Sequence, residues 1–187
     1  DVEAREYFSK FDDHTISVVW SGKKCTDTIN LFFDAKHVDE RKQFLTTSYN
    51  PQAYVDYRQT NVSINEYLTK EMSHFSNENN VRSIPSAIDS FKPVQRKVAF
   101  TMMCKGVNGE TKVSSLAARV AQETSYHHAD DSIKETIVHM AQRFVGTNNV
   151  TLMEPIGQFG SRSARNNHAA FRYITTKVLP IMRAIFP

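Results

Sequence analysis

Residues 113–144 read VSSLAARVAQETSYHHADDSIKETIVHMAQRF and contain two helical patterns separated by a short turn. The apolar side chains of the first pattern recur at the spacing of one helix face, and they are Val113, Leu116, Ala117, Val120 and Ala121. The second pattern has the same spacing, with Ile133, Ile137, Met140, Ala141 and Phe144. Asp130, at the end of the connector SYHHAD, is suited to cap the second helix. Two short helices across a tight turn predict a helix-turn-helix, a weak signal when taken alone.

The sequence after Gly146 changes to short β-prone runs and turns, among them VTLM, IGQFGSR and FRYITTKV. Gly157 and Gly160 punctuate these runs as hairpin residues, and the polar segment SARNNH forms a tip between them and FRYITTKV. A helix-turn-helix followed by a hairpin is the layout of a winged helix, with SARNNH as part of the wing. We therefore predict an α+β fold, mainly helical, in which a short helical segment precedes a winged helix.

The first part of the chain is predicted to form that helical segment. AREYFSKF, TINLFFDA and HVDERKQFL each have apolar residues spaced near 3.6, whereas residues 47–62 lack periodicity and are typical of a linker. Ser63 then suits the N-cap of a longer helix, with Glu66 completing a capping box. The predicted domains are accordingly residues 1–62, a helical segment with its linker, and residues 63–187.

Composition excludes several classes of protein. With 187 residues the chain suits one sizeable domain or two small ones, and it has no apolar run of about 18 residues, so no membrane partner is expected. The two cysteines, Cys25 and Cys104, lie far apart without zinc-ligand spacing. They predict reduced thiols of an intracellular protein and no metal site. Both chain ends predict a piece of a longer protein.

Basic residues are concentrated in two stretches. Residues 82–119 carry seven bases against two acids, and residues 155–187 carry five bases and no acid. Residues 1–40, by contrast, carry nine acids and five bases. Basic segments of this kind favour contact with a polyanion such as DNA. A basic face without a partner is the alternative that charge alone leaves open.

Several motifs together resemble those of the type IIA DNA topoisomerases, in the same order and at similar spacing. They are RSIPSAIDSFKPVQRKV, SYHHADDSIKETIVHMAQRFVGTNN, EPIGQFGSR and AAFRYI. The resemblance covers residues 64–187 strongly. The opening, AREYFS through DERKQFL, resembles the end of the Toprim region in the single-chain eukaryotic and viral enzymes. The second predicted domain would then be a winged-helix DNA gate that follows the Toprim domain.

The resemblance implies a set of catalytic residues. Tyr173 falls on the tyrosine that attacks a backbone phosphate and becomes joined to the 5′ end, and Arg172 on the arginine beside it. Arg82 matches an arginine near the scissile phosphate. His127 and His128 match a histidine pair, of which His128 is the expected contact to the active-site phosphate or tyrosine.

It also implies a set of DNA-contact residues. Lys92, Arg96 and Lys97 match basic residues that hold the DNA backbone, and they lie at the start of a predicted helix whose N–H groups also favour anions. His127 joins them from the histidine pair. Arg162 in FGSR either binds phosphate or covers the hairpin, and the sequence does not choose between these two roles.

The chemistry follows from these residue types. A phenol with an ordinary pKa near 10 is a poor nucleophile at neutral pH. Neighbouring guanidinium and imidazole groups favour the phenolate and stabilise the charge that develops on phosphorus. Arginine suits this role because it stays charged and can bond two phosphate oxygens at once.

The resemblance further implies Mg²⁺ and ATP for the full-length enzyme, a homodimer acting on double-stranded DNA, and a location in the nucleus or at a site of viral DNA replication. No EGDSA-like or DxDxDG acid cluster occurs in the chain, so both cofactors are expected to bind outside it. The isolated chain is therefore expected to be inactive.

Two single positions and one four-residue segment depart from the family pattern. Ser90 and Ala129 stand where glycines are typical, and RNNH replaces Gly-Gly-Lys-Asp ahead of the tyrosine. A winged-helix DNA-binding module without chemistry is the alternative function. The Arg172–Tyr173 pair favours the enzyme, because a regulator has no need for that tyrosine.

Overall fold

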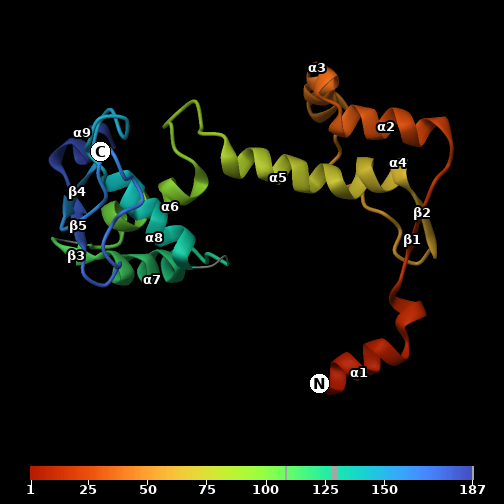
Figure 1. Ribbon diagram of the computed structural model, residues 1–187, viewed down its shortest axis with the longest axis horizontal. Coiled ribbons are helices and arrows are strands. Elements are labelled where there is room, and N and C mark those ends of the chain that lie inside the picture. The colour runs from red at the N-terminus through yellow and green to blue at the C-terminus, as the bar shows by residue number, and fades with distance from the viewer. Residues whose placement is uncertain (108, 128–129, 187) are drawn as a thin grey trace. The chain divides into compact units, whose positions relative to one another are not determined.

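The computed structural model describes residues 1–107, 109–127 and 130–186, and the chain forms two compact units (Figure 1). Unit 1 is Asp1–Val81 and unit 2 is Arg82–Pro187. The division lies between residues 81 and 82, whereas the sequence placed it between 62 and 63. The physical reason is that the helical turns after Ser63 pack against the helix Lys23–Phe33 and so belong to unit 1.

Unit 1 is built mainly from short helices, as predicted. Its elements are α1 (Val2–Ser9), the 3₁₀ turn η1 (Phe11–His14), β1 (Ser17–Val19), α2 (Lys23–Phe33), η2 (Ala35–His37), α3 (Val38–Gln43), the π-turn η3 (Phe44–Ser48), β2 (Asn61–Ser63), α4 (Ile64–Tyr67), the π-turn η4 (Leu68–Met72) and α5 (Ser73–Ser83), whose last two residues fall in unit 2. The strands β1 and β2 run parallel, with Val18 opposite Val62. This two-stranded sheet was not predicted, because each strand has only three residues.

Ser63 caps the helix α4 as expected, since its Oγ accepts the N–H of Glu66 at 3.1 Å. The carboxylate of Glu66 accepts from Lys70 Nζ at 2.6 Å, one turn further along the helix. The N-cap is thus confirmed, and the glutamate forms an i,i+4 ion pair that also supports the helix.

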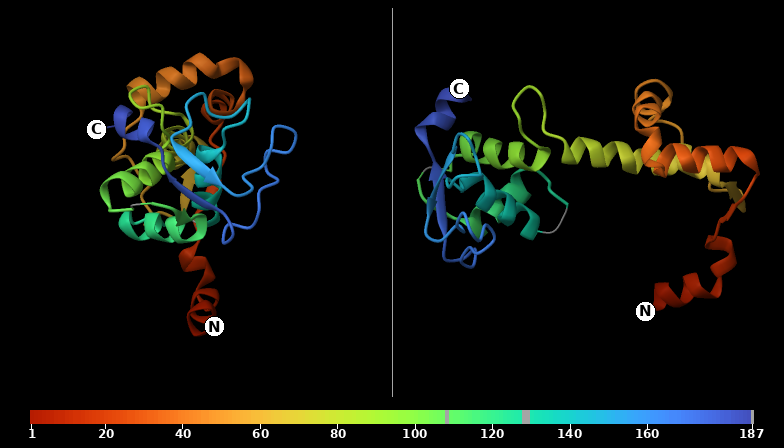
Figure 2. Two further views of the ribbon diagram at one scale, coloured as in Figure 1. Left: turned by 90° about the vertical axis from the view of Figure 1, so that its left-hand side faces the viewer. Right: turned by 45° about the horizontal axis from the view of Figure 1, so that its top comes forward.

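Unit 2 combines helices with a three-stranded antiparallel sheet. The elements are α6 (Pro93–Cys104), β3 (Thr111–Lys112), α7 (Val113–Glu123), α8 (Asp130–Ala141), β4 (Met153–Ile156), β5 (Thr175–Val178) and α9 (Pro180–Ile185), with the strands in the order β3-β5-β4. The pair α7–α8 followed by β4–β5 is the predicted helix-turn-helix and hairpin. In Figure 2 the blue chain between β4 and β5 forms a loop that leaves the sheet.

The core of unit 2 lies where α6, α7 and α8 meet the sheet. The predicted stripe residues are buried there, including Val113, Leu116, Ala117, Val120, Ile133, Ile137, Met140 and Ala141. Ala121 and Phe144 are only half-buried, and Phe144 lies beyond α8, which ends at Ala141. The α+β, mainly helical fold class is confirmed.

The start of β5 differs from the sequence prediction. The strand expected at FRYITTKV begins only at Thr175, so Tyr173 lies in the turn before β5. Ser90 has φ 59°, in the left-handed region that favours glycine. A glycine at this position would adopt the turn before α6 without steric cost, which accounts for the glycine typical of the family pattern. Ala129 lies outside the described residues.

No described helix combines the length and apolar character needed to cross a membrane.

Candidate functional site

The Arg172–Tyr173 pair lies in an anchored turn of unit 2. Tyr173 is 73% exposed, its N–H donates to Ala170 O at 2.8 Å, and the Arg172 guanidinium carbon lies 5.3 Å from the centre of its ring. The next residue, Ile174, is buried in the core. The turn therefore combines a fixed backbone with a phenol that faces solvent and has a permanent cation beside it.

The start of α7 holds this turn on both sides of the tyrosine. Val113 N–H donates to Ile174 O at 3.0 Å, and Ser114 N–H donates to Phe171 O at 3.3 Å. These first N–H groups of a helix have no partner within the helix itself. Because they bond the Tyr173 turn, the position of the phenol is tied to the first helix of the helix-turn-helix.

A basic hollow of about 590 Å³ gathers other predicted site residues on unit 2. Most of its lining side chains are cationic, polar or aromatic. The lining residues are Arg82, Lys92, Val94, Gln95, Tyr126, Ser132, Thr136, His139, Asn148 and Arg165. The structure thus brings Arg82 and Lys92 together. Tyr173 is not among the lining residues of this hollow, within the part of the chain that the structure describes.

Arg96 and Lys97, predicted as DNA contacts, also bond within the protein. Arg96 donates from Nε and Nη2 to the two carboxylate oxygens of Asp89, at 2.6 and 2.8 Å. Lys97 Nζ donates to Thr124 O at 3.1 Å and lies 5.3 Å from the centre of the Tyr126 ring. Both cations therefore stabilise the packing around α6 as well as adding positive charge.

The contact between Asp89 and Arg96 shifts the pKa of both side chains. The hydrogen bonds from Arg96, with the Phe91 N–H as a further donor, lower the pKa of Asp89 to about 2. The same contact raises the pKa of Arg96. Asp89 therefore stays ionised through the neutral range and holds the turn that precedes α6.

The remaining predicted contacts differ in their surroundings. Lys92, Arg162 and His127 are exposed on the surface of unit 2. Lys92 stands at the N-cap of α6, where its own N–H donates to Gln95 Oε1 at 2.8 Å. His128 lies outside the described residues, so its predicted role as a catalytic contact has no structural account.

Sequence reasoning missed a buried glutamine that holds the wing. Gln142 is fully buried, and its Nε2 donates to Phe159 O at 2.8 Å and to Arg165 O at 2.9 Å. Arg165 Nε donates back to Gln142 Oε1 at 3.2 Å. Gly160 lies so close to this contact that an added Cβ would stand 2.2 Å from Arg165 O. Because Gln142 is a polar residue that follows the last residue of α8, nothing in the sequence indicated that it would be buried.

The comparisons with known proteins agree with this geometry. Residues 82–187 match the family model for the A-type subunit of DNA gyrase/topoisomerase IV, and residues 1–80 match the C-terminal associated domain of TOPRIM. The chain is 42% identical to DNA topoisomerase 2-alpha of Rattus norvegicus and 41% identical to that of Homo sapiens, over 99% of its length. The chain belongs to the type II DNA topoisomerase family. It spans 13% of the length of each of these two relatives.

A solved topoisomerase structure has the same fold. The Plasmodium falciparum topoisomerase II DNA-binding, cleavage and re-ligation domain superimposes with a TM-score of 0.72 and 37% sequence identity. The match covers 97% of this chain and 25% of that one. Both units of the chain thus have counterparts within a topoisomerase II.

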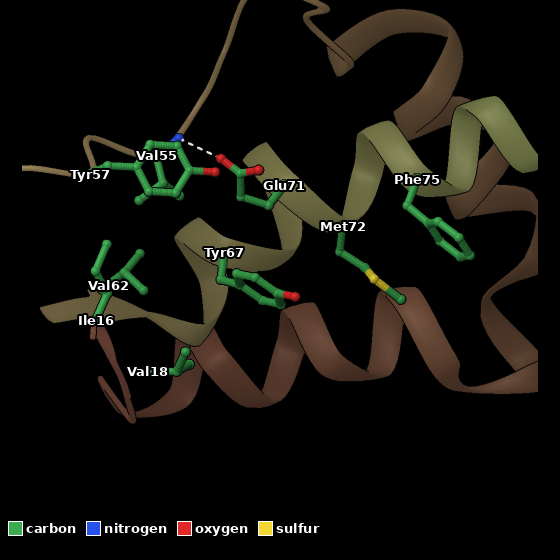
Figure 3. A pocket seen from close by; sticks show the side chains of 9 residues that line it. All are labelled: Ile16, Val18, Val55, Tyr57, Val62, Tyr67, Glu71, Met72 and Phe75. Carbon is green, nitrogen blue, oxygen red and sulfur yellow. Dashed lines mark hydrogen bonds between the residues drawn. The ribbon is translucent and has the colours of Figure 1, made fainter. Parts of the chain in front are cut away.

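Unit 1 contains a second hollow, which is lined mostly by apolar side chains. It has about 620 Å³ and is lined by Ile16, Val18, Val55, Tyr57, Val62, Tyr67, Glu71, Met72 and Phe75. Figure 3 shows Glu71 accepting the N–H of Val55, at 2.9 Å. A hydrogen bond to Glu71 raises the pKa of the Tyr57 phenol, which makes it a poorer nucleophile. Glu71 therefore serves as an internal acceptor in this hollow.

Membership of the type II topoisomerase family implies, in general, the cofactors Mg²⁺ and ATP. Hard divalent cations bind sets of carboxylate and carbonyl oxygens. Among residues 1–107, 109–127 and 130–186, no group of three or more His, Cys, Asp or Glu side chains could hold a metal ion. The described residues therefore do not fit a resident metal ion.

Proposed function

We propose that this chain is the DNA-binding and DNA-cleaving portion of an ATP-dependent type IIA topoisomerase. The observation that carries the proposal is the exposed Tyr173 phenol beside Arg172, in a turn bonded to the start of the helix-turn-helix. The chain belongs to the same family as its relatives, and DNA is the partner of that family. The roles of individual residues, the homodimer and a nuclear location are part of the proposal.

The proposed reaction is a transesterification. Tyr173 Oη attacks a backbone phosphorus, the new P–O bond joins the protein to the 5′ end, and the bond from phosphorus to the 3′ oxygen breaks. The phenol gives up its proton and the departing 3′ oxygen gains one, so the phosphodiester is exchanged and not hydrolysed. Reversal by the freed 3′ hydroxyl restores the DNA without an outside energy source.

Arg172 is proposed to neutralise the charge that develops on the phosphate oxygens and to favour the phenolate of Tyr173. Arg82 would reach the same phosphate in the assembled enzyme, and His128 completes the proposed catalytic set from the connector between α7 and α8. Mg²⁺ and ATP are proposed to bind elsewhere in the full-length enzyme.

The proposed DNA-contact residues are Lys92, Arg96, Lys97, His127 and Arg162. Lys92 and Arg162 are exposed, so they are expected to supply most of the salt-dependent binding. Arg96 and Lys97 each retain an N–H group beyond their internal bonds, and we propose that these groups contact the DNA backbone secondarily.

The decisive test is Tyr173→Phe in the full-length enzyme. Covalent protein–DNA complexes, trapped by denaturant after incubation with supercoiled DNA, should be abolished, while DNA binding measured by fluorescence anisotropy should persist. Tyr57→Phe is the matched control, because Tyr57 is comparably exposed at 67% and lies in unit 1. Covalent complexes that persist in Tyr173→Phe would exclude Tyr173 as the nucleophile, whereas a wild-type enzyme that binds DNA but forms no covalent complex would favour the non-catalytic DNA-binding module.

A further inference from the structure

Two neighbouring residues of α8 hold the chain segment that leads into the Tyr173 turn. His168 Nε2 lies 3.2 Å from Glu135 Oε1, and the His168 ring stacks on Phe171 with centroids 4.9 Å apart. Lys134 Nζ lies 5.9 Å from the centre of the Phe171 ring. We call these four residues, Lys134, Glu135, His168 and Phe171, the loop clamp.

Both ring nitrogens of His168 have acceptor oxygens within hydrogen-bonding distance. Its Nδ1 lies 3.0 Å from Ala169 O and its Nε2 faces the Glu135 carboxylate, so both ring nitrogens point at acceptors. The His168 side chain is 12% exposed, so its contact with Glu135 is largely shielded from solvent.

The clamp also explains acids on a helix that is expected to approach DNA. Glu135 faces the His168 ring at 3.2 Å, and Asp131 pairs with Lys134 at 2.9 Å, so each of these two carboxylates has a partner within unit 2. Their charges are thereby compensated where a phosphate backbone would otherwise be repelled. The acids do not need a contact with DNA to account for their presence.

The loop clamp ends at Phe171, two residues before Tyr173 in the chain. Phe171 belongs to the clamp, and its carbonyl accepts the N–H of Ser114 at the start of α7. Tyr173 follows two residues later, and its N–H closes the turn onto Ala170 O. The turn is thus held by α7 through its backbone and by α8 through the clamp side chains.

We propose that the Glu135–His168 pair is a positioning device for the cleavage reaction, which fixes the Arg172–Tyr173 turn to the second helix of the helix-turn-helix. The inference rests on the proposed role of Tyr173 as nucleophile. Docking of α8 on DNA would then set the approach of the phenol to the phosphate. Small displacements of a reacting group lower rates steeply, by as much as about 100-fold for 1 Å.

The test uses the full-length enzyme, with three quantities measured for each variant. These are the rate of covalent complex formation on a duplex that traps the cleaved state, the Kd for the same duplex by anisotropy, and the midpoint of thermal unfolding. The variants are Glu135→Gln, His168→Glu, and the exchange of both residues, Glu135→His with His168→Glu.

His168→Glu places two carboxylates opposite each other and should slow covalent complex formation by about tenfold or more, with an unchanged Kd. Glu135→Gln keeps the shape but loses the charge, so a smaller loss of rate is expected. The exchanged pair restores the contact between an imidazole and a carboxylate and should recover most of the rate. Glu123→Gln is the control, because Glu123 pairs with Lys105 at 3.3 Å and belongs to no proposed site.

Each alternative outcome has a distinct meaning. Wild-type rates in His168→Glu and Glu135→Gln would overturn the proposal, as would loss of rate without recovery in a correctly folded exchanged pair. If His168→Glu does not fold, Glu135→Gln and the exchanged pair still decide the result. Covalent complexes formed by Tyr173→Phe would overturn the proposed role of Tyr173, on which the inference rests, whatever the clamp variants do.

Discussion

The two units of the chain differ in how they bury apolar surface. In unit 2 the buried apolar residues form one continuous cluster between α6, α7, α8 and the sheet. The buried apolar residues of unit 1 are Cys25, Val55, Val62 and Leu68, whereas many of its large apolar side chains are exposed, including Tyr7, Phe8, Phe11 and Trp20. The proposed reactive residues all lie on the densely packed unit. A reacting side chain is held in place best by elements whose own packing is fixed.

The largest expected effect is a loss of stability when a core leucine is truncated. Leu116→Ala in unit 2 should lower the free energy of unfolding by about 2–5 kcal/mol, because Leu116 is fully buried and its neighbours cannot fill the cavity. Leu68→Ala in unit 1 should cost less, since the surrounding surface is open to water. Hydrogen exchange of peptides from each unit would measure both losses separately.

Equal losses at the two leucines would contradict the contrast in packing. Fluorescence of Trp20, the only tryptophan, gives an independent measure of unit 1. Leu116→Ala should leave the unfolding followed by this fluorescence unchanged if the units are stable independently. A shift of the Trp20 signal in Leu116→Ala would show that unit 1 depends on the core of unit 2.

A smaller effect is expected when buried polar groups lose their partner. Gln142→Met leaves Phe159 O and Arg165 O without the amide that bonds them, which should cost about 1–3 kcal/mol and loosen the wing. Thr28→Val in unit 1 removes the bond from Thr28 Oγ1 to Asn65 Oδ1, at 2.7 Å, and should cost about 1 kcal/mol.

Chemical denaturation of both variants gives these two values. Hydrogen exchange in residues 157–170 provides the specific measure for the wing, and it should rise in Gln142→Met only. Exchange that stays at the wild-type rate in this segment would show that Gln142 does not hold the wing. A loss in Thr28→Val that exceeds the loss in Gln142→Met would reverse the expected order of the two units.

These comparisons show which features the sequence could reveal. The helix-turn-helix was predictable because apolar side chains must line one face of each helix, and Leu116 and Ile137 fall on those faces. The N-cap Ser63 was predictable for a similar reason, since the first N–H groups of a helix need an acceptor nearby in the sequence. Local periodicity and capping therefore gave most of the secondary structure.

Contacts between distant residues were not predictable in this way. The Glu135–His168 pair and the bonds of Gln142 to the wing join residues that are far apart in the chain, and neither follows from a repeating pattern. The same holds for the domain boundary, because packing of the turns after Ser63 onto α2 decides it. The start of β5 after Tyr173 depends on its pairing with β3 and β4.

The smallest expected effect concerns stability in acid, and it again compares the units. Asp89 pairs with Arg96 in unit 2, and its pKa in the folded protein is about 2, below the ordinary value of 3.8. A carboxylate with a lowered pKa stabilises the folded state above its unfolded pKa, and this contribution is lost as the pH falls through about 4 toward about 2. Unit 2 should therefore lose stability across that range.

Asp89→Asn should accordingly destabilise unit 2 at pH 7, and its difference from the wild type should shrink toward pH 2. Asp56 in unit 1 also has a lowered pKa, through its bonds to Arg58, but the Arg58 side chain is 90% exposed. Solvent screens such a pair, so Asp56→Asn should change the stability of unit 1 less at every pH. Urea unfolding at pH 7, 4 and 2, followed by hydrogen exchange in each unit, would measure both differences. A constant difference between Asp89→Asn and the wild type at all three pH values would show that the Arg96 contact does not stabilise unit 2 through the charge of Asp89.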